Sequence, residues 1–138
     1  MILVFGKTGQ VATELQRLGN VVALGRDQAN LSDPAACADA IRTHAPRAVI
    51  NAAAYTAVDR AQEEGALATI INGDAPTAMA QACVELGIPL IHISTDYVFA
   101  GMGDAPWHPN DPTAPQNAYG RSKLAGEIGI RNSGAVHV

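Results

Sequence analysis

The sequence predicts an α/β domain with a parallel, doubly wound sheet and helices on both faces. Three observations predict it: strand-like and helix-like segments alternate at short spacing, the strand-like segments are continuously apolar, and alanine supplies much of the apolar content. Small alanine side chains let helices lie close on a sheet. The 138 residues correspond to one domain of ordinary size.

Four short apolar segments are expected to form the strands of this sheet. Each is bounded by glycine, proline or polar residues, as is typical of strands buried on both faces. They are residues 2–5, 21–24, 48–51 and 89–94. A further strand begins at residues 135–138, whereas the glycines and prolines of residues 101–116 predict a loop with Trp107 as its anchor.

Helices are expected between these strands. Residues 10–18 carry Val11, Leu15 and Leu18 on one helical face, and Asp33 and Pro34 provide a cap and a first helical residue for a helix over 34–44. A longer helical region over 58–86 should be interrupted near Gly73 and Pro76 and should end at Gly87. The last helix is expected over residues 119–131.

The composition argues against several classes of protein. A chain with 48% hydrophobic and 16% charged residues is not expected to be disordered. Its net charge of −4 provides no basic surface for nucleic acid, and no apolar run approaches the ~20 residues that span a membrane. Cys37 and Cys83 match no metal or redox spacing. The apolar start at residues 1–5 has no basic leader and is broken at Gly6, so that it does not resemble a secretory signal. We therefore expect a soluble, reduced protein of the cytoplasm, without a metal site.

A glycine-containing turn follows the first expected strand. Gly6, Gly9 and Ala12 form a G-x-x-G-x-x-A pattern that opens directly into a helix. Glycines permit a tight bend and a close approach of the backbone to a pyrophosphate, and a small third residue permits close packing of helix on strand. The pattern predicts a Rossmann-like NAD(P)-binding domain over residues 1–138, although an ordinary strand-to-helix turn is the alternative.

The residues after the second expected strand bear on the choice of cofactor. Arg26 stands near the position at which an arginine accommodates the 2′-phosphate of NADP, and it favours NADPH. Asp27 beside it leaves NADH open, because an acidic residue there binds the ribose. The alternative interpretation is a solvated pair of surface charges.

Three side chains suggest a site for proton transfer. Tyr119 and Lys123 are four residues apart on the last expected helix, so that Lys123 can lie beneath Tyr119. A nearby ammonium stabilises a phenolate, which brings the phenolic pKa from about 10 toward the range in which a general acid works. Thr95, after the fourth strand, would supply a hydroxyl that orients a carbonyl oxygen. His92 alternates with apolar neighbours and is interpreted as a core residue.

The sequence resembles the extended short-chain dehydrogenase/reductase family, and within it the dTDP-4-dehydrorhamnose reductase branch. The segments that carry the resemblance extend over the whole chain in the family's order. They are F-G-K-T-G-Q-V, N-A-A-A-Y-T-A-V-D, H-I-S-T-D-Y-V-F, G-D-A-P-W and Y-G-R-S-K-L-A-G-E. Two residues depart from the usual pattern, since Ala12 replaces a glycine and Asn30 replaces a frequent acidic residue.

The resemblance implies a set of roles for individual residues. Tyr119 would be the proton donor, Lys123 its partner and Thr95 the orienting hydroxyl, while Thr95 and Asp96 would contact the sugar. The residues expected to bind the cofactor are Gly6, Gly9, Gln10, Val11, Arg26, Asn30, Leu31, Ala54, Tyr55, Thr56, Tyr119 and Lys123.

The resemblance also implies a reaction and its partners. NADPH, or else NADH, would reduce the 4-keto group of a dTDP-linked 6-deoxyhexose to give dTDP-L-rhamnose, a precursor of lipopolysaccharide and other cell-surface polysaccharides. The complete protein would be capable of forming a homodimer. Some relatives use magnesium, but Glu14 alone is no coordination sphere and is interpreted as a surface residue.

Two alternatives remain open, and the length of the chain adds an expectation. Asp96 after the catalytic hydroxyl is compatible with another nucleotide-sugar reductase, an epimerase or a dehydratase. A non-catalytic NADP-binding subunit is disfavoured by the presence of Thr95, Tyr119 and Lys123.

Because 138 residues is short for this family, we expect the amino-terminal portion of a reductase of about twice this length or more, without the carboxy-terminal substrate-binding region.

Overall fold

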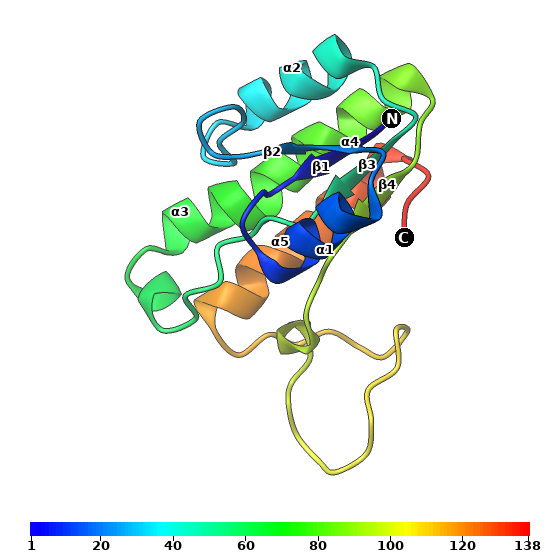
Figure 1. Ribbon diagram of the computed structural model, residues 1–138. Coiled ribbons are helices and arrows are strands. Elements are labelled where there is room, and N and C mark those ends of the chain that lie inside the picture. The colour runs from blue at the N-terminus through cyan, green and yellow to red at the C-terminus, as the bar shows by residue number, and fades with distance from the viewer.

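The computed structural model describes residues 1–138 and contains one parallel sheet. Its strands are β1 (Ile2–Phe5), β2 (Val21–Leu24), β3 (Ala48–Asn51) and β4 (Leu90–His92), in the spatial order β2-β1-β3-β4 (Figure 1). The chain moves from β1 to one side and then crosses to the other side for β3. Strand order therefore reverses at β1, and the predicted doubly wound parallel sheet is confirmed.

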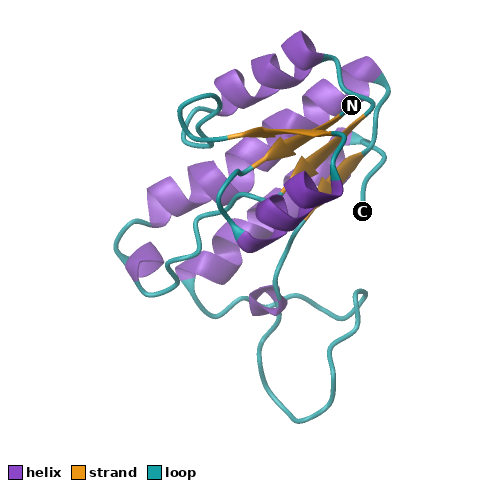
Figure 2. Ribbon diagram, viewed as in Figure 1, coloured by secondary structure: helices purple, strands orange, loops and turns teal.

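The structure contains five α-helices, and helices lie on both faces of the sheet as predicted. They are α1 (Gln10–Leu18), α2 (Pro34–His44), α3 (Gly65–Thr69), α4 (Ala75–Leu86) and α5 (Ala118–Ser133). Figure 2 shows α4 between α2 and α5 on one face, whereas α1 lies alone on the other face. None of the helices has both the length and the apolar character that crossing a bilayer requires.

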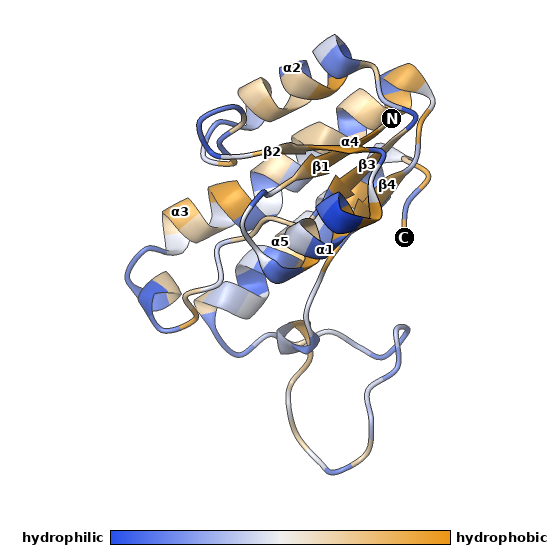
Figure 3. Cartoon of the chain, viewed as in Figure 1, coloured by the Kyte–Doolittle hydropathy of each residue, from blue (hydrophilic) through white to orange (hydrophobic).

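The main core lies between the sheet and the layer of α2, α4 and α5. Leu3, Phe5, Val49 and Leu90 of the strands pack there against side chains such as Met79, and all five are fully buried. Hydropathy mapped on the chain shows the same concentration of apolar residues in the strands (Figure 3). The opposite face is covered less completely.

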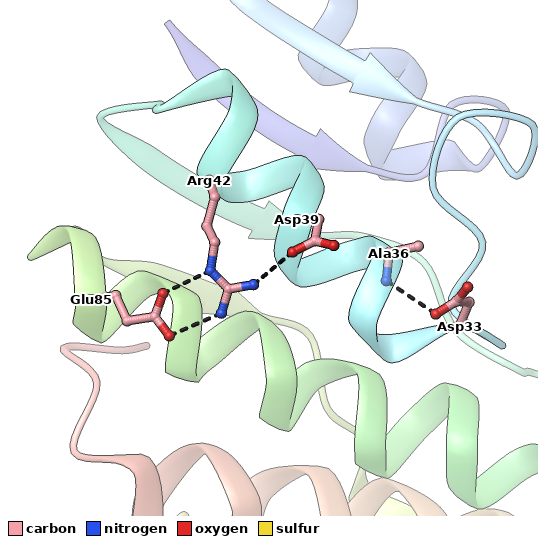
Figure 4. Close-up of polar contacts among 5 residues, drawn as sticks. All are labelled: Asp33, Ala36, Asp39, Arg42 and Glu85. Atoms are coloured by element: carbon pink, nitrogen blue, oxygen red, sulfur yellow. Dashed lines mark hydrogen bonds and ion pairs between the residues drawn. The ribbon is translucent and has the colours of Figure 1, made fainter.

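Local signals explain where the second helix begins and how it joins the fourth. The Asp33 carboxylate accepts a hydrogen bond from the Ala36 amide at 3.1 Å, as the expected cap does (Figure 4). Near the other end of α2, Arg42 binds both carboxylate oxygens of Glu85 on α4, at 2.8 and 2.9 Å, and also contacts Asp39. The fork-like geometry fixes the relative position of the two helices.

The expected helical region over 58–86 is interrupted around Gly73, as predicted, and also at an earlier point in the chain. A 3₁₀ turn at Arg60–Gln62 precedes α3, and a π turn at Ile70–Asp74 joins α3 to α4. Pro76 lies in the first turn of α4, where its missing N–H is tolerated, so that the irregular backbone falls just before it.

Two further segments differ from expectation at their boundaries. β4 ends at His92 instead of residue 94, because the chain turns at Thr95 into a 3₁₀ turn over Asp96–Val98. The final residues form the start of a further parallel strand beside β4. The Leu90 amide donates a hydrogen bond to the Val136 carbonyl, and the Val138 amide donates to the Leu90 carbonyl.

Candidate active site

The glycine turn lies at the carboxyl end of β1, where the strand order reverses. Gly6 has φ +105°, and a Cβ at this position would lie 3.2 Å from the carbonyl oxygen of Ala52, which follows β3. A side chain there would therefore be strained and crowded. Ala12, the expected small residue at the contact of helix and strand, is fully buried.

The first turn of α1 is open. Gly9 is the N-cap of this helix, no side chain caps it, and a Cβ built on Gly9 would meet nothing within 4 Å. Gln10 and Val11 are exposed beside it. Free N–H groups at a helix N-terminus attract anionic groups, and space at Gly9 permits a close approach. The turn can therefore hold a pyrophosphate, as its sequence pattern predicts.

The segment after β3 lies against Gly6 and is held by one buried side chain. Oδ1 of Asn72 accepts a hydrogen bond from the Tyr55 amide at 2.8 Å, and its Nδ2 donates to the Tyr55 carbonyl at 2.9 Å. The Tyr55 hydroxyl donates to Glu64, which raises the pKa of the phenol. Ala54 and Thr56 flank this fixed residue, so that all three expected cofactor residues lie at the sheet edge that carries Gly6.

Lys123 is the most deeply buried charged residue of the site. Only 2% of it is exposed, and its Nζ donates a 2.5 Å hydrogen bond to the carbonyl of Ile93, just past β4. Burial lowers the pKa of Lys123 to about 8, against the opposing effect of the Glu127 carboxylate. The Lys123 amine is thus present in both its charged and its neutral form in mildly alkaline solution.

Tyr119 and Thr95 lie near this lysine in the fold. Tyr119 is one helical turn before Lys123 in α5, and its ring packs edge to face against Tyr97, with centroids 5.4 Å apart. Thr95 follows Ile93 by two residues, and its hydroxyl accepts a 3.2 Å hydrogen bond from the Tyr97 amide. The hydrogen bond of Lys123 goes to Ile93 and not to the phenol, which the four-residue spacing alone did not predict.

The residues expected near the adenosine part of a cofactor lie in the loop after β2. Arg26 and Asp27 are exposed, and neither forms an ion pair. The Asn30 side chain accepts a hydrogen bond from the Ser32 amide at 3.0 Å. Leu31 belongs to the core cluster, so that only its backbone is available to a ligand.

A cavity of about 720 Å³ lies beside Thr95 and Asp96. The indole of Trp107, on the long loop, stacks on the ring of Phe99 at a centroid distance of 5.0 Å and forms part of the cavity lining. This stacking agrees with the interpretation of Trp107 as an anchor of its loop. No cluster of three His, Cys, Asp or Glu side chains could hold a metal ion, and Glu14 is engaged with Arg17.

Sequence reasoning missed several residues that build the site. Asn72 and Ser122 are buried polar residues joined by a 3.0 Å hydrogen bond, and Ser122 also donates to the Tyr119 carbonyl at 2.7 Å. His92 was expected in the core, but its hydrogen bond with Asn51 was not expected. Tyr97 and Glu127 belong to two of the motifs that the sequence analysis quoted. Membership of these motifs was the only signal in the sequence that could have indicated them.

Known structures share this fold over almost the whole chain. A dTDP-4-dehydrorhamnose reductase from Clostridium acetobutylicum superposes with a TM-score of 0.92 at 34% identity, covering 99% of this chain and 50% of that one. A dTDP-4-dehydrorhamnose reductase from Bacillus anthracis, solved in complex with NADP, gives a TM-score of 0.92 at 29% identity and the same coverage.

Curated relatives give the same family at higher identity. The dTDP-4-dehydrorhamnose reductases of Salmonella typhimurium and Escherichia coli K12 are 44% and 46% identical over 145 residues, which cover 99% of this chain. The chain spans about half the length of these relatives, 48% in both cases. The family model described as "RmlD substrate binding domain" matches residues 1–138, and the chain belongs to this family.

Proposed function

We propose that this chain is the NAD(P)-binding and proton-donating part of a dTDP-4-dehydrorhamnose reductase. One observation carries the proposal: buried Lys123 is fixed at the carboxyl end of β4, one turn from Tyr119, while the open N-terminus of α1 lies at the same edge of the sheet. In a doubly wound sheet, ligands bind at this edge, next to the reversal of strand order.

The residues of the chain divide the chemistry between them. Bound NADPH would supply a hydride to C4 of the keto sugar. Tyr119 gives its phenolic proton to the carbonyl oxygen as negative charge develops there, and Lys123 stabilises the resulting phenolate. Thr95 orients the same oxygen through its hydroxyl, and Asp96 contacts the sugar. The products are the alcohol and the oxidised cofactor.

Cofactor preference follows from the loop after β2. Arg26 is exposed and free of ion pairs, so that its guanidinium is available to the 2′-phosphate of NADP. The NADP complex of the Bacillus anthracis relative supports this preference. Asp27 provides the acceptor through which NADH would also bind.

The complete reductase would supply the rest of the sugar site from a carboxy-terminal region. The relatives are about twice as long, and the face of the sheet that carries α1 exposes apolar side chains, with Ile91 42% and Ile93 43% exposed. Residues 1–138 would then form the cofactor domain. Formation of a homodimer and cytoplasmic localisation stay predictions.

Replacement of Tyr119 by phenylalanine in the complete enzyme tests the proposal. Y119F should lower the turnover number with NADPH and dTDP-4-dehydrorhamnose by about 10²-fold or more, because the proton donor is lost. The dissociation constant for NADPH, measured by fluorescence, should change less than about threefold, because the variant loses a single hydroxyl. Undiminished turnover would show that Tyr119 is not the donor.

Substrate controls separate this function from its alternatives. The unmodified enzyme should oxidise NADPH with dTDP-4-dehydrorhamnose but not with UDP-glucose or without a sugar. NADPH binding without oxidation would instead indicate a non-catalytic subunit. Conversion of a dTDP-hexose without net NADPH consumption would indicate an epimerase or a dehydratase.

A further inference from the structure

Two side chains of α5 hold consecutive residues of the segment that leads from β4 to Thr95. The ammonium of Lys123 donates to the Ile93 carbonyl, and Glu127, one turn later, accepts a hydrogen bond from the Ser94 hydroxyl. Thr95 follows directly. The backbone just ahead of the orienting hydroxyl is therefore fixed by two contacts to the helix that carries Tyr119.

Glu127 is four residues after Lys123 on α5, so that the two side chains lie on the same face of the helix and their charges can interact. Its carboxylate favours the protonated form of Lys123, whereas burial of the lysine favours the neutral form. Two further titratable groups lie nearby: His92 on β4 interacts electrostatically with Lys123, and Arg131, one turn after Glu127 on α5, borders the same cavity as the carboxylate. Burial and the neighbouring ammonium lower the pKa of His92 to about 3, so that it stays neutral and adds no positive charge.

Glu127 and Thr95 border the same cavity of about 720 Å³. The hydrogen bond from Ser94 satisfies one carboxylate oxygen of Glu127 and fixes the side chain at the wall of this cavity. The partner of Glu127 is a residue of the segment that leads directly to Thr95, not a neighbour on its own helix. The contact between Ser94 and Glu127 thus holds the segment that precedes Thr95 against α5. The ammonium of Lys123 lies one turn away along the same helix.

We propose that Glu127 is a positioning residue for the reduction, which holds Thr95 through Ser94 and keeps Lys123 in its charged form. The inference rests on the function proposed above. Glu127 itself would not touch the reacting atoms. Its hydrogen bond fixes geometry and its charge sets the protonation of a neighbour, and these two effects can be separated by substitution.

Substitutions in the complete enzyme separate the hydrogen bond from the charge. S94A removes the hydrogen bond but leaves the carboxylate, and we expect about a tenfold lower kcat with an unchanged pH profile. S94T retains a hydroxyl and should restore kcat to within about twofold of the parent. E127Q retains an acceptor for Ser94 but loses the charge, so that the alkaline decline of kcat should move to lower pH by about one unit.

Binding and stability measurements exclude a merely structural effect. NADPH affinity and the urea midpoint of S94A and E127Q should match those of the parent. E14Q, which removes the same charge from the exposed part of α1, should leave both kcat and the pH profile unchanged. The proposal is overturned if S94A and E127Q behave like E14Q, or if their loss of kcat accompanies an equal loss of folded enzyme.

A titration without turnover keeps this inference separate from the proposed function. The pKa of Lys123, followed by NMR of its labelled side chain, should be lower in E127Q than in the parent. An unchanged titration would refute the electrostatic part of the proposal, even in an active reductase. If the parent enzyme did not reduce the sugar while the titration shifted as expected, the proposed function would fail and the coupling of Glu127 to Lys123 would stand.

Discussion

Asn72 connects the segment after β3 to the helix that carries Tyr119. Its side chain pairs with both backbone polar groups of Tyr55 and with the hydroxyl of Ser122, and only 1% of the residue is exposed. Ser122 in turn donates to the Tyr119 carbonyl. A buried amide with this many partners is costly to replace, because each group left unpaired loses its hydration without compensation.

Replacement of Asn72 by alanine should therefore destabilise the fold. We expect N72A to lower the free energy of unfolding in urea by about 2–4 kcal/mol, since the amide and carbonyl of Tyr55 lose their partners. N132A, at an exposed position of α5, is the matched control and should change the free energy by less than about 0.5 kcal/mol. Equal effects of the two substitutions would contradict the role assigned to Asn72.

At the scale of elements, α5 depends on glycines for its close approach to other segments. A Cβ on Gly120 would lie 2.3 Å from the Tyr97 carbonyl oxygen, and one on Gly126 would lie 2.2 Å from the Asn72 carbonyl oxygen. Neither obstacle can rotate away, because both are backbone atoms. At these two positions α5 thus contacts the 3₁₀ turn after Thr95 and the π turn at Asn72 more closely than any larger residue permits.

Replacement of Gly126 by alanine tests this packing. Alanine favours a helix over glycine by about 1 kcal/mol, so that a substitution without obstruction would stabilise α5. We expect G126A instead to lower the free energy of unfolding by about 1–3 kcal/mol, because the helix must move away from the π turn. In G65A, where a Cβ meets nothing within 4 Å, the change should be neutral or stabilising. A stabilised G126A would refute the argument.

The sequence predicted elements well where local patterns determine them. The apolar runs of β1, β2 and β3 and the cap of α2 at Asp33 have the predicted bounds. An interruption near Gly73 was predicted and lies within the π turn at Ile70–Asp74, whereas the early end of β4 was not predicted. Both places form contacts with residues distant in sequence, since Asn72 binds Tyr55 and Ser122, and Lys123 takes the Ile93 carbonyl.

For the site, the motifs indicated candidate residues but not how these residues contact one another. The G-x-x-G-x-x-A turn and the four-residue spacing of Tyr119 and Lys123 are local features that a sequence displays directly. The acceptor for Lys123 and the contact of Ser94 with Glu127 arise only when α5 packs against the end of β4. Spacing along one helix contains no information on such contacts between elements.

At the scale of the whole molecule, buried ionisable groups couple folding to pH. Burial lowers the pKa of Lys123 to about 8 from an ordinary value of 10.5, so that the unfolded chain binds more protons between these values. Stability should therefore rise with pH across this window. Cys37 and Cys83 act in the opposite direction, because burial raises their pKa values to about 12 and 11 and the unfolded chain loses these protons first.

Comparison with a variant that lacks the buried ammonium isolates the contribution of Lys123. We expect the free energy of unfolding of K123M, relative to that of the parent, to be highest near pH 7.5 and to fall by about 3 kcal/mol by pH 10.5, as the lysine loses its charge in both states of the parent. Urea unfolding under reducing conditions measures this difference, and the two thiols cancel because both proteins contain them. K7M, at an exposed lysine, should follow the parent at every pH. A pH-independent difference between K123M and the parent would mean that Lys123 is not buried as a charged group.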